Sequence, residues 1–197
     1  MKGTPATATE VLDFWFGQPP ARAPRGEWFR KDAGFDAQIQ ARFGATLQAA
    51  LAGQLQGWTA SNEGTLALIV VLDQFTRNIS RNPGRDTAAA FAGDAQVLAL
   101  AQALVASGGD RALPPLQRWF AYLPFEHAED MAAQRQSMQL FTALAAEHPA
   151  LADATHWAQK HADVVARFGR YPHRNAALGR VSTAEEEAFL REPGSSF

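Results

Sequence analysis

Helical periodicity is the feature of this 197-residue chain that most restricts its fold. Large apolar residues recur at four-residue spacing in one long segment, at Phe35, Ile39, Phe43, Leu47 and Leu51. This spacing places side chains along one face of an α-helix. No segment alternates apolar and polar residues, with β-branched enrichment, for long enough to make a sheet. The sequence therefore predicts an all-α protein.

Start and stop signals divide the chain into about seven or eight helices, with segments predicted at 7–16, 35–53, 65–79, 86–107, 124–147, 151–168 and 183–191. Thr7 with Glu10 is a capping-box pattern, and Ser182 and Thr183, followed by Glu185 and Glu186, give a strong N-cap for the last helix. Pro124 is expected at the first position of its helix, where its missing N–H costs nothing. Short loops favour stacked antiparallel pairs of a tetratricopeptide-like kind, although no clean 34-residue consensus is present.

Length and composition indicate one ordinary globular domain. The chain is long enough for one sizeable core, and its residues are 47% hydrophobic and 19% charged. We expect a single domain over 1–197, with a disordered tail at 192–197.

The net charge and the absence of cysteine limit the kinds of partner and the cellular compartment that we expect. The net charge of -2 argues against bulk binding to nucleic acid. The absence of cysteine fits a reducing compartment, so a cytoplasmic location is expected. The N-terminus lacks a secretory signal, and the apolar run 66–72 is too short for a membrane span.

The end of the third predicted helix carries the first group of candidate site residues. In helical projection Asp73, Arg77, Arg81, Gln74 and Asn78 share one polar face, and apolar residues occupy the other. We predict that Arg77, Asn78 and Arg81 bind a ligand and that Asp73 orients a catalytic group. The alternative is a structural Asp73–Arg77 ion pair at i,i+4 spacing.

A second basic segment runs from Arg167 to Arg180 without a carboxylate. Arginine forks and histidine beside loop amides suit carboxylate or phosphate, because charge-assisted bonds fix both position and orientation. The residues predicted to bind are Arg170, His173, Arg174 and Asn175. The alternative is a solvated loop whose arginines pair with neighbouring acids.

The third candidate segment is the start of the helix predicted at 124–147. His127 and Gln134 project inward together, whereas Glu129 points away. This favours His127 as an acid or base, with Asp130 or Asp73 as its orienting carboxylate and Gln134 as a binding residue. The alternative is a histidine at the edge of the core, bonded to a carbonyl.

No metal or cofactor is predicted. His161 lies on the apolar stripe of its helix, where an uncharged, hydrogen-bonded imidazole is expected. Asp153-x-x-His156 alone is a weak metal pattern. Phosphate-binding loops, dinucleotide fingerprints, nucleophile elbows and the common zinc motif are absent.

Four stretches, 11–17, 72–78, 123–130 and 168–175, resemble the bacterial domain-of-unknown-function family 924. The resemblance covers nearly the whole chain and implies a tetratricopeptide-like α-helical fold, without an established activity, substrate or cofactor. The chain departs from the family at Thr76, where proline is usual, and at Ala128, where serine is usual.

These motifs support three hypotheses of function, and the sequence does not decide whether the chain is an enzyme. In the first, both Arg-Asn motifs and His127 converge on a concave polar site for a small anionic molecule or an acidic peptide end. In the second, His127 serves a hydrolase with arginine-stabilised anions. In the third, the chain is a scaffold that binds a protein partner through exposed aromatic residues, among them Trp28, Phe29, Trp119 and Phe120.

Overall fold

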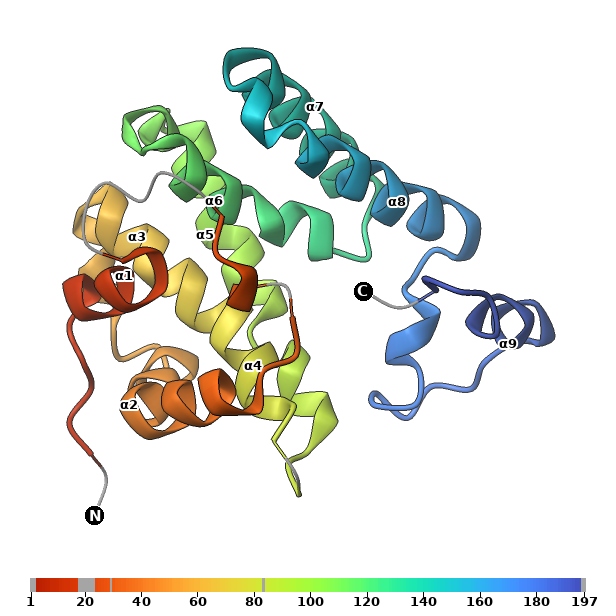
Figure 1. Ribbon diagram of the computed structural model, residues 1–197, viewed down its shortest axis with the longest axis horizontal. Coiled ribbons are helices and arrows are strands. Elements are labelled where there is room, and N and C mark those ends of the chain that lie inside the picture. Colours follow the sequence, from red (N-terminus) through yellow and green to blue (C-terminus); the bar gives the residue numbers. More distant parts are fainter. Residues whose placement is uncertain (1–2, 18–23, 29, 83, 196–197) are drawn as a thin grey trace. The chain divides into compact units, whose positions relative to one another are not determined.

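A computed structural model of the chain describes residues 3–17, 24–28, 30–82 and 84–195 (Figure 1). In these ranges every regular element is helical and no β-strand is present, so the all-α prediction is confirmed. The residues group into two compact units, Met1–Pro124 (unit 1) and Phe125–Phe197 (unit 2), and each is described by itself. The single domain over 1–197 stays a prediction, as does the tetratricopeptide-like pairing.

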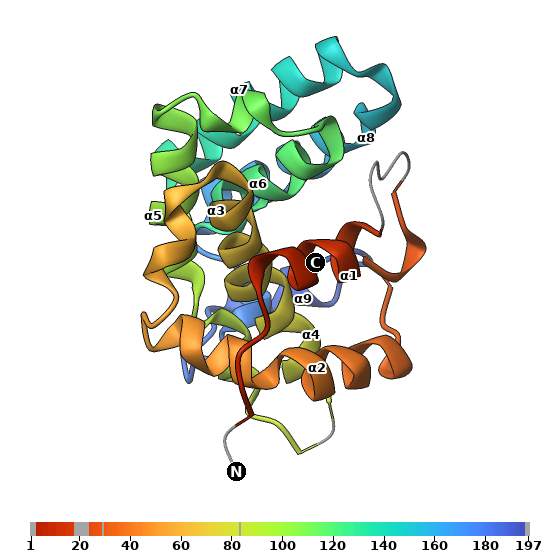
Figure 2. The same ribbon diagram turned by 90° about the vertical axis from the view of Figure 1, so that its left-hand side faces the viewer.

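Unit 1 is built around one long helical rod. The rod consists of α3 (Asn62–Ile69), a π-helical segment (Val70–Phe75) and α4 (Thr76–Ser80), which follow one another without a break. The helices α1 (Ala8–Phe16), α2 (Ala33–Leu51) and α5 (Asp94–Ala106) all pack against it (Figure 2). The 73–81 motif, at the C-terminal end of the rod, lies against both α2 and α5.

Aromatic rings fill the core of unit 1. The Trp15 ring contacts those of Trp28, Phe35 and Phe120, and Trp28 Nε1 donates to the Trp15 carbonyl at 3.0 Å. Trp28, Trp119 and Phe120 are only 2%, 9% and 1% exposed. The expectation that these three lie at the surface is therefore wrong, because they pack against other rings; Phe29 lies outside the described residues.

The helix predicted at 86–107 is interrupted at Gly93. A 3-10 turn at Thr87–Phe91 comes first, and α5 begins only at Asp94. A Cβ atom on Gly93 would lie 2.4 Å from the Leu72 carbonyl oxygen of the rod. Only glycine allows this close approach of the two backbones.

One stretch of the described residues, Thr87–Ala106, has the length and composition of a membrane span, with a mean hydropathy of 1.5. It is divided at Gly93, and α5 alone has 13 residues. Such a helix is about 20 Å long, whereas the hydrocarbon core of a bilayer is about 30 Å thick.

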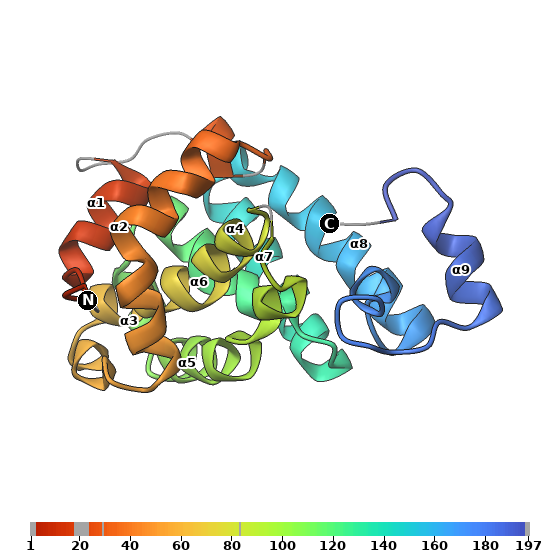
Figure 3. The ribbon, with the colours of Figure 1, turned by 90° about the horizontal axis from the view of Figure 1, so that it is seen from below.

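Unit 2 contains the end of α6 (Pro115–His127), α7 (Met131–Glu147), α8 (Asp153–Phe168) and α9 (Ala184–Leu190). The short 3-10 turn Pro149–Leu151 joins α7 to α8, which pack side by side as an antiparallel hairpin (Figure 1). After α8 the chain passes through a 3-10 turn at Pro172–Arg174, against which α9 packs (Figure 3).

The prediction of a single helix at 124–147 is wrong, because this segment belongs to two helices, the end of α6 and the whole of α7. Pro124 lies inside α6 and does not start a helix. Residues 128–130 are not helical, and the Asp130 carboxylate caps α7 by accepting from Ala133 N at 2.7 Å. Asp130 thus provides the side-chain acceptor for the unpaired N–H groups at the start of α7.

Several predicted helix ends are confirmed. The capping boxes at Thr7 and Thr183 are both formed. Gly169 ends α8 in the left-handed conformation, with φ of 70°. In the predicted tail, Ser195 is buried and its hydroxyl donates to the Leu190 carbonyl at 3.2 Å. Residues 196–197 lie outside the described part of the chain.

Candidate functional site

Side chains from α7 and the 170–174 segment close the C-terminal end of α6 in unit 2. Gln134 Nε2 donates to the carbonyls of Glu126 and Ala128, each at 2.8 Å, and more weakly to that of Phe125 at 3.4 Å. Arg174 Nη2 donates to the His127 carbonyl at 2.9 Å. The last carbonyls of a helix have no partner within it, so these bonds hold the end of α6 in place.

Tyr171 is the centre of this group and is fully buried. Its hydroxyl accepts from Gln134 Nε2 at 2.8 Å and donates to the Glu126 carbonyl. The Arg174 guanidinium carbon lies 4.4 Å from the centre of its ring. The rings of His161 and His173 each lie 5.6 Å from it, centre to centre. We call this group, with its neighbours, the Tyr171 cluster: Glu126, His127, Gln134, His161, Tyr171, His173 and Arg174.

His161 is an uncharged imidazole with a defined tautomer. Its Nδ1 lies 2.9 Å from the Trp157 carbonyl oxygen and 3.1 Å from Glu126 Oε1. The Trp157 carbonyl can only accept, so Nδ1 carries the hydrogen and Nε2 carries the lone pair. Burial, with a smaller contribution from His127, lowers the pKa of His161 to about 3. The bond to the Trp157 carbonyl and the lowered pKa agree with the prediction of a neutral, hydrogen-bonded His161.

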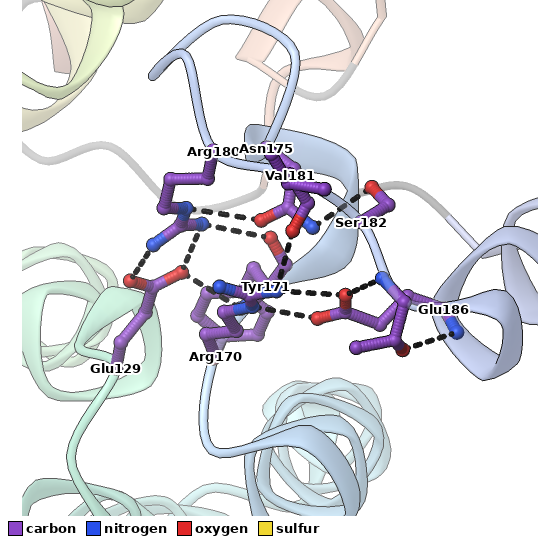
Figure 4. A network of polar contacts seen from close by, with 9 residues as sticks. Glu129, Arg170, Tyr171, Asn175, Arg180, Val181, Ser182 and Glu186 are labelled. Atoms are coloured by element: carbon purple, nitrogen blue, oxygen red, sulfur yellow. Dashed lines mark hydrogen bonds and ion pairs between the residues drawn. The ribbon is translucent and has the colours of Figure 1, made fainter.

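Glu129 ties the loop after α6 to the 170–180 segment (Figure 4). Arg180 holds its carboxylate with both terminal nitrogens, at 2.6 and 2.9 Å, and the Tyr171 backbone N–H donates to it at 2.7 Å. Burial raises the pKa of Glu129, but these bonds outweigh it and leave the pKa below its ordinary value. Glu129 therefore points toward the basic segment and not away from it, contrary to the prediction.

Arg170 makes a second fork in the same network (Figure 4). It donates to both oxygens of Glu186, at 2.6 and 2.8 Å, and to the Val181 carbonyl at 3.0 Å. Bonds from Arg170 lower the pKa of Glu186 to about 2 against the effect of burial. Asn175 donates to Ser182 Oγ and accepts from Arg180, both at 3.0 Å. Arg170 and Asn175 thus hold the segment between α8 and α9.

In unit 1 the Asp73–Arg77 ion pair is formed. Arg77 Nη1 lies 2.8 Å from Asp73 Oδ1, and its Nη2 lies 3.0 Å from Asp94 Oδ1 on α5. The Asp73 side chain is fully buried and also accepts from Gln74 at 2.6 Å. The Asp73–Arg77 pair is the one that the structural alternative predicts, and the contact with Asp94 also links the rod to α5.

The other two binding residues predicted in the first motif meet an acid on α2. Asn78 Nδ2 donates to Asp36 Oδ1 at 2.7 Å, and Arg81 Nη1 lies 3.9 Å from the same oxygen. Asp36 is buried, whereas the Arg81 side chain is 34% exposed. A groove of about 810 Å³ nearby is lined by Thr76, Ile79 and Ser80 of α4 together with α2, and none of the predicted site residues lines it.

The structure brings four of the predicted site residues into one cluster: His127, Gln134, His173 and Arg174. The Asp130 carboxylate caps α7 by accepting from Ala133 N, and no hydrogen bond joins it to that cluster among the described contacts. The convergence of the two Arg-Asn motifs on one site stays a prediction. Sequence reasoning missed Glu126 and Tyr171, although each directly adjoins a predicted residue, and it assigned His161 to structure alone.

With this geometry in view, the chain can be assigned to a class: an all-α protein with a buried polar cluster at a helix end. Residues 11–194 match the bacterial protein family of unknown function DUF924, and the chain belongs to that family. A solved structure, "Protein of Unknown Function ATU0120" from Agrobacterium tumefaciens, is similar to it. That protein is 38% identical, with a TM-score of 0.80 over 93% of this chain and 96% of the other. No curated protein matches.

Proposed function

We propose that this protein binds a small anionic molecule, through a phosphate or carboxylate group, at His127, His173 and Arg174 of unit 2. The observation that supports the proposal is the gathering of the Arg174 guanidinium and the His161 and His173 rings around Tyr171, with the His127 ring centre 6.0 Å from that of His161. Guanidinium and imidazole N–H groups form short, charge-assisted bonds to anionic oxygens.

Burial and rigidity favour such a site. Arg174 is 6% exposed and is held by its stack on Tyr171 and its bond to the His127 carbonyl. His127 and His173 are partly exposed, so they offer the route from solvent. A positioned guanidinium loses little side-chain freedom when an anion binds, which increases affinity.

The other arginines of the basic segment support the site without joining it. Arg170 and Arg180 are each engaged in a two-nitrogen contact with a glutamate, so their charges are already matched. They fix the backbone on either side of His173 and Arg174. In this proposal the anion contacts Arg174 and the imidazoles, and the Arg170–Glu186 and Arg180–Glu129 contacts keep the backbone around these groups in position.

The experiment is calorimetric titration with inorganic phosphate, acetate and a short peptide with an acidic C-terminus, in a buffer that contains a chelator. We expect at least one of the three to bind saturably, and His173→Gln to weaken it about 10- to 100-fold, the value of one charged hydrogen bond. Arg167→Met is the matched control, because Arg167 pairs with the exposed Glu185. No binding by the parent, or equal binding by His173→Gln, rejects the proposal.

The hydrolase hypothesis uses the same imidazole. His127 lies at the end of α6, with its ring centre 6.0 Å from that of His161. Hydrolysis of phosphate and carboxylic esters by the parent, lost in His127→Ala, would favour this second function. Activity that is unaffected by the substitution removes His127 from the mechanism.

A further inference from the structure

The Tyr171 cluster contains one carboxylate and two imidazoles that could together bind a metal ion. Glu126, His127 and His161 each offer one ligand atom, and these atoms all lie within 4.8 Å of one another. Glu126 and His127 are adjacent at the end of α6, and His161 comes from the middle of α8. The helix end and the α8 face thus bring together residues that are more than 30 positions apart in the sequence.

We propose that Glu126, His127 and His161 bind a divalent transition-metal ion of the Zn²⁺ type. Two imidazoles and one carboxylate are a common protein ligand set for catalytic zinc, which keeps a further position open for water or substrate. Ligand atoms around such an ion are about 3.4 Å apart, given bonds of about 2.1 Å. Side-chain rotations complete the site: the Glu126 carboxylate, now 3.1 Å from Nδ1 of His161, turns toward Nε2 of that ring, and the three groups draw together.

The orientation of His161 supports this inference. The Trp157 carbonyl oxygen, 2.9 Å from Nδ1, fixes the hydrogen on that nitrogen, which leaves the lone pair on Nε2. Metal-binding histidines usually donate their other ring N–H to an acceptor such as a backbone carbonyl in this way, and the bond fixes both tautomer and ring orientation. A neutral imidazole held in one tautomer is the form that a metal ion requires.

An independent observation comes from Gln134, which is fully buried beside Glu126. Its nitrogen donates to the Glu126 carbonyl and to Tyr171, whereas its oxygen Oε1 has no hydrogen-bond partner among the described residues. Buried acceptors nearly always have a donor. A water molecule bound to the ion would supply one.

This site goes beyond the proposed anion site, with which it shares His127. An ion at this position would add a positive centre beside Arg174 and increase the attraction for an anion. The anion titration is carried out with a chelator present, so it tests the protein groups alone. Failure of one proposal therefore leaves the other standing.

The test uses tag-free protein freed of metal with a chelator, then titrated with Zn²⁺ by calorimetry and with Co²⁺ by visible absorption. We expect one Zn²⁺ per chain and the intense Co²⁺ bands of a low-coordinate imidazole and carboxylate site. His127→Ala should weaken Zn²⁺ binding about 100-fold, because loss of even an outer-shell partner costs 10- to 100-fold. Glu126→Gln keeps the side-chain shape and should also weaken it.

His156→Ala is the matched control, since His156 is exposed on α8 and should leave the titration unchanged. The parent protein alone can overturn the proposal, whatever the stability of the variants. Absence of stoichiometric Zn²⁺ binding by the parent, or Co²⁺ bands of a six-coordinate aqueous ion only, refutes it. Equal Zn²⁺ affinity in the parent, His127→Ala and Glu126→Gln does the same.

Discussion

Gln134→Glu should severely destabilise unit 2, because it replaces a donor with an acceptor at the end of α6. The amide hydrogens of Gln134 face the carbonyls of Glu126, Ala128 and Phe125 and the hydroxyl of Tyr171. Glutamate has nearly the same shape but presents a carboxylate oxygen there. The substitution therefore changes hydrogen bonding and charge while it preserves packing.

The magnitude follows from the bonds that are lost. Two amide N–H groups contribute about 1 kcal/mol each, and a buried carbonyl that loses its donor costs about 1–3 kcal/mol. The Glu126 carbonyl keeps Tyr171 as a donor, so the Ala128 carbonyl bears most of this loss. A buried carboxylate that faces carbonyl oxygens adds about 3 kcal/mol. The total of at least about 6 kcal/mol is comparable with the whole stability of a small domain.

Urea unfolding followed by circular dichroism at pH 7 measures this effect. Gln139→Glu is the matched control, because it makes the same change on the exposed face of α7 and should alter stability by less than about 0.5 kcal/mol. Gln134→Leu removes the bonds without adding charge and should fall between the two. A loss below about 1 kcal/mol in Gln134→Glu would refute this description of the helix end.

Three further predictions concern other parts of the chain. Glu186→Gln should remove a stabilising contribution that is present above the ordinary pKa of about 4.5 and lost as pH falls toward about 2. Urea midpoints of parent and variant should therefore draw together as pH falls from about 4.5 toward 2, and a difference that does not change with pH would contradict this. Gly93→Ala should lower the melting temperature by several degrees, because its Cβ would meet the Leu72 carbonyl; an unchanged melting temperature would contradict that contact. Arg77→Met should cost about 3 kcal/mol in chemical unfolding, since Asp73 is fully buried; a neutral result would mean the pair adds nothing.

Most of the fold could be predicted because helix signals are local. The capping residues Thr7 and Thr183 act within three positions of themselves, and the apolar stripe of α2 needs only helical periodicity. The breaks were missed for physical reasons that are not local. Gly93 is required by a backbone that comes from 21 positions earlier, and the end of α6 is set by Gln134 and Arg174.

The site was only partly predictable for the same reason. His127, Gln134, His173 and Arg174 could be chosen by residue type and spacing, and they lie in one cluster. Side-chain chemistry alone did not separate binding arginines from structural ones, because pairing depends on which acids the fold brings near. Arg170 pairs with Glu186, which lies 16 positions later, and Arg180 pairs with Glu129, which lies 51 positions earlier. No helical periodicity connects the members of either pair.

The central claim is that His127, His173 and Arg174 act together on one anion, and NMR of the histidine ring nitrogens tests it most directly. Phosphate is added at constant ionic strength and pH with a chelator present. The account predicts that the His127 and His173 signals shift along one saturation curve with a common dissociation constant, while the exposed His156 signal stays fixed. Signals that do not move, or that move together with that of His156 without saturating, would contradict it.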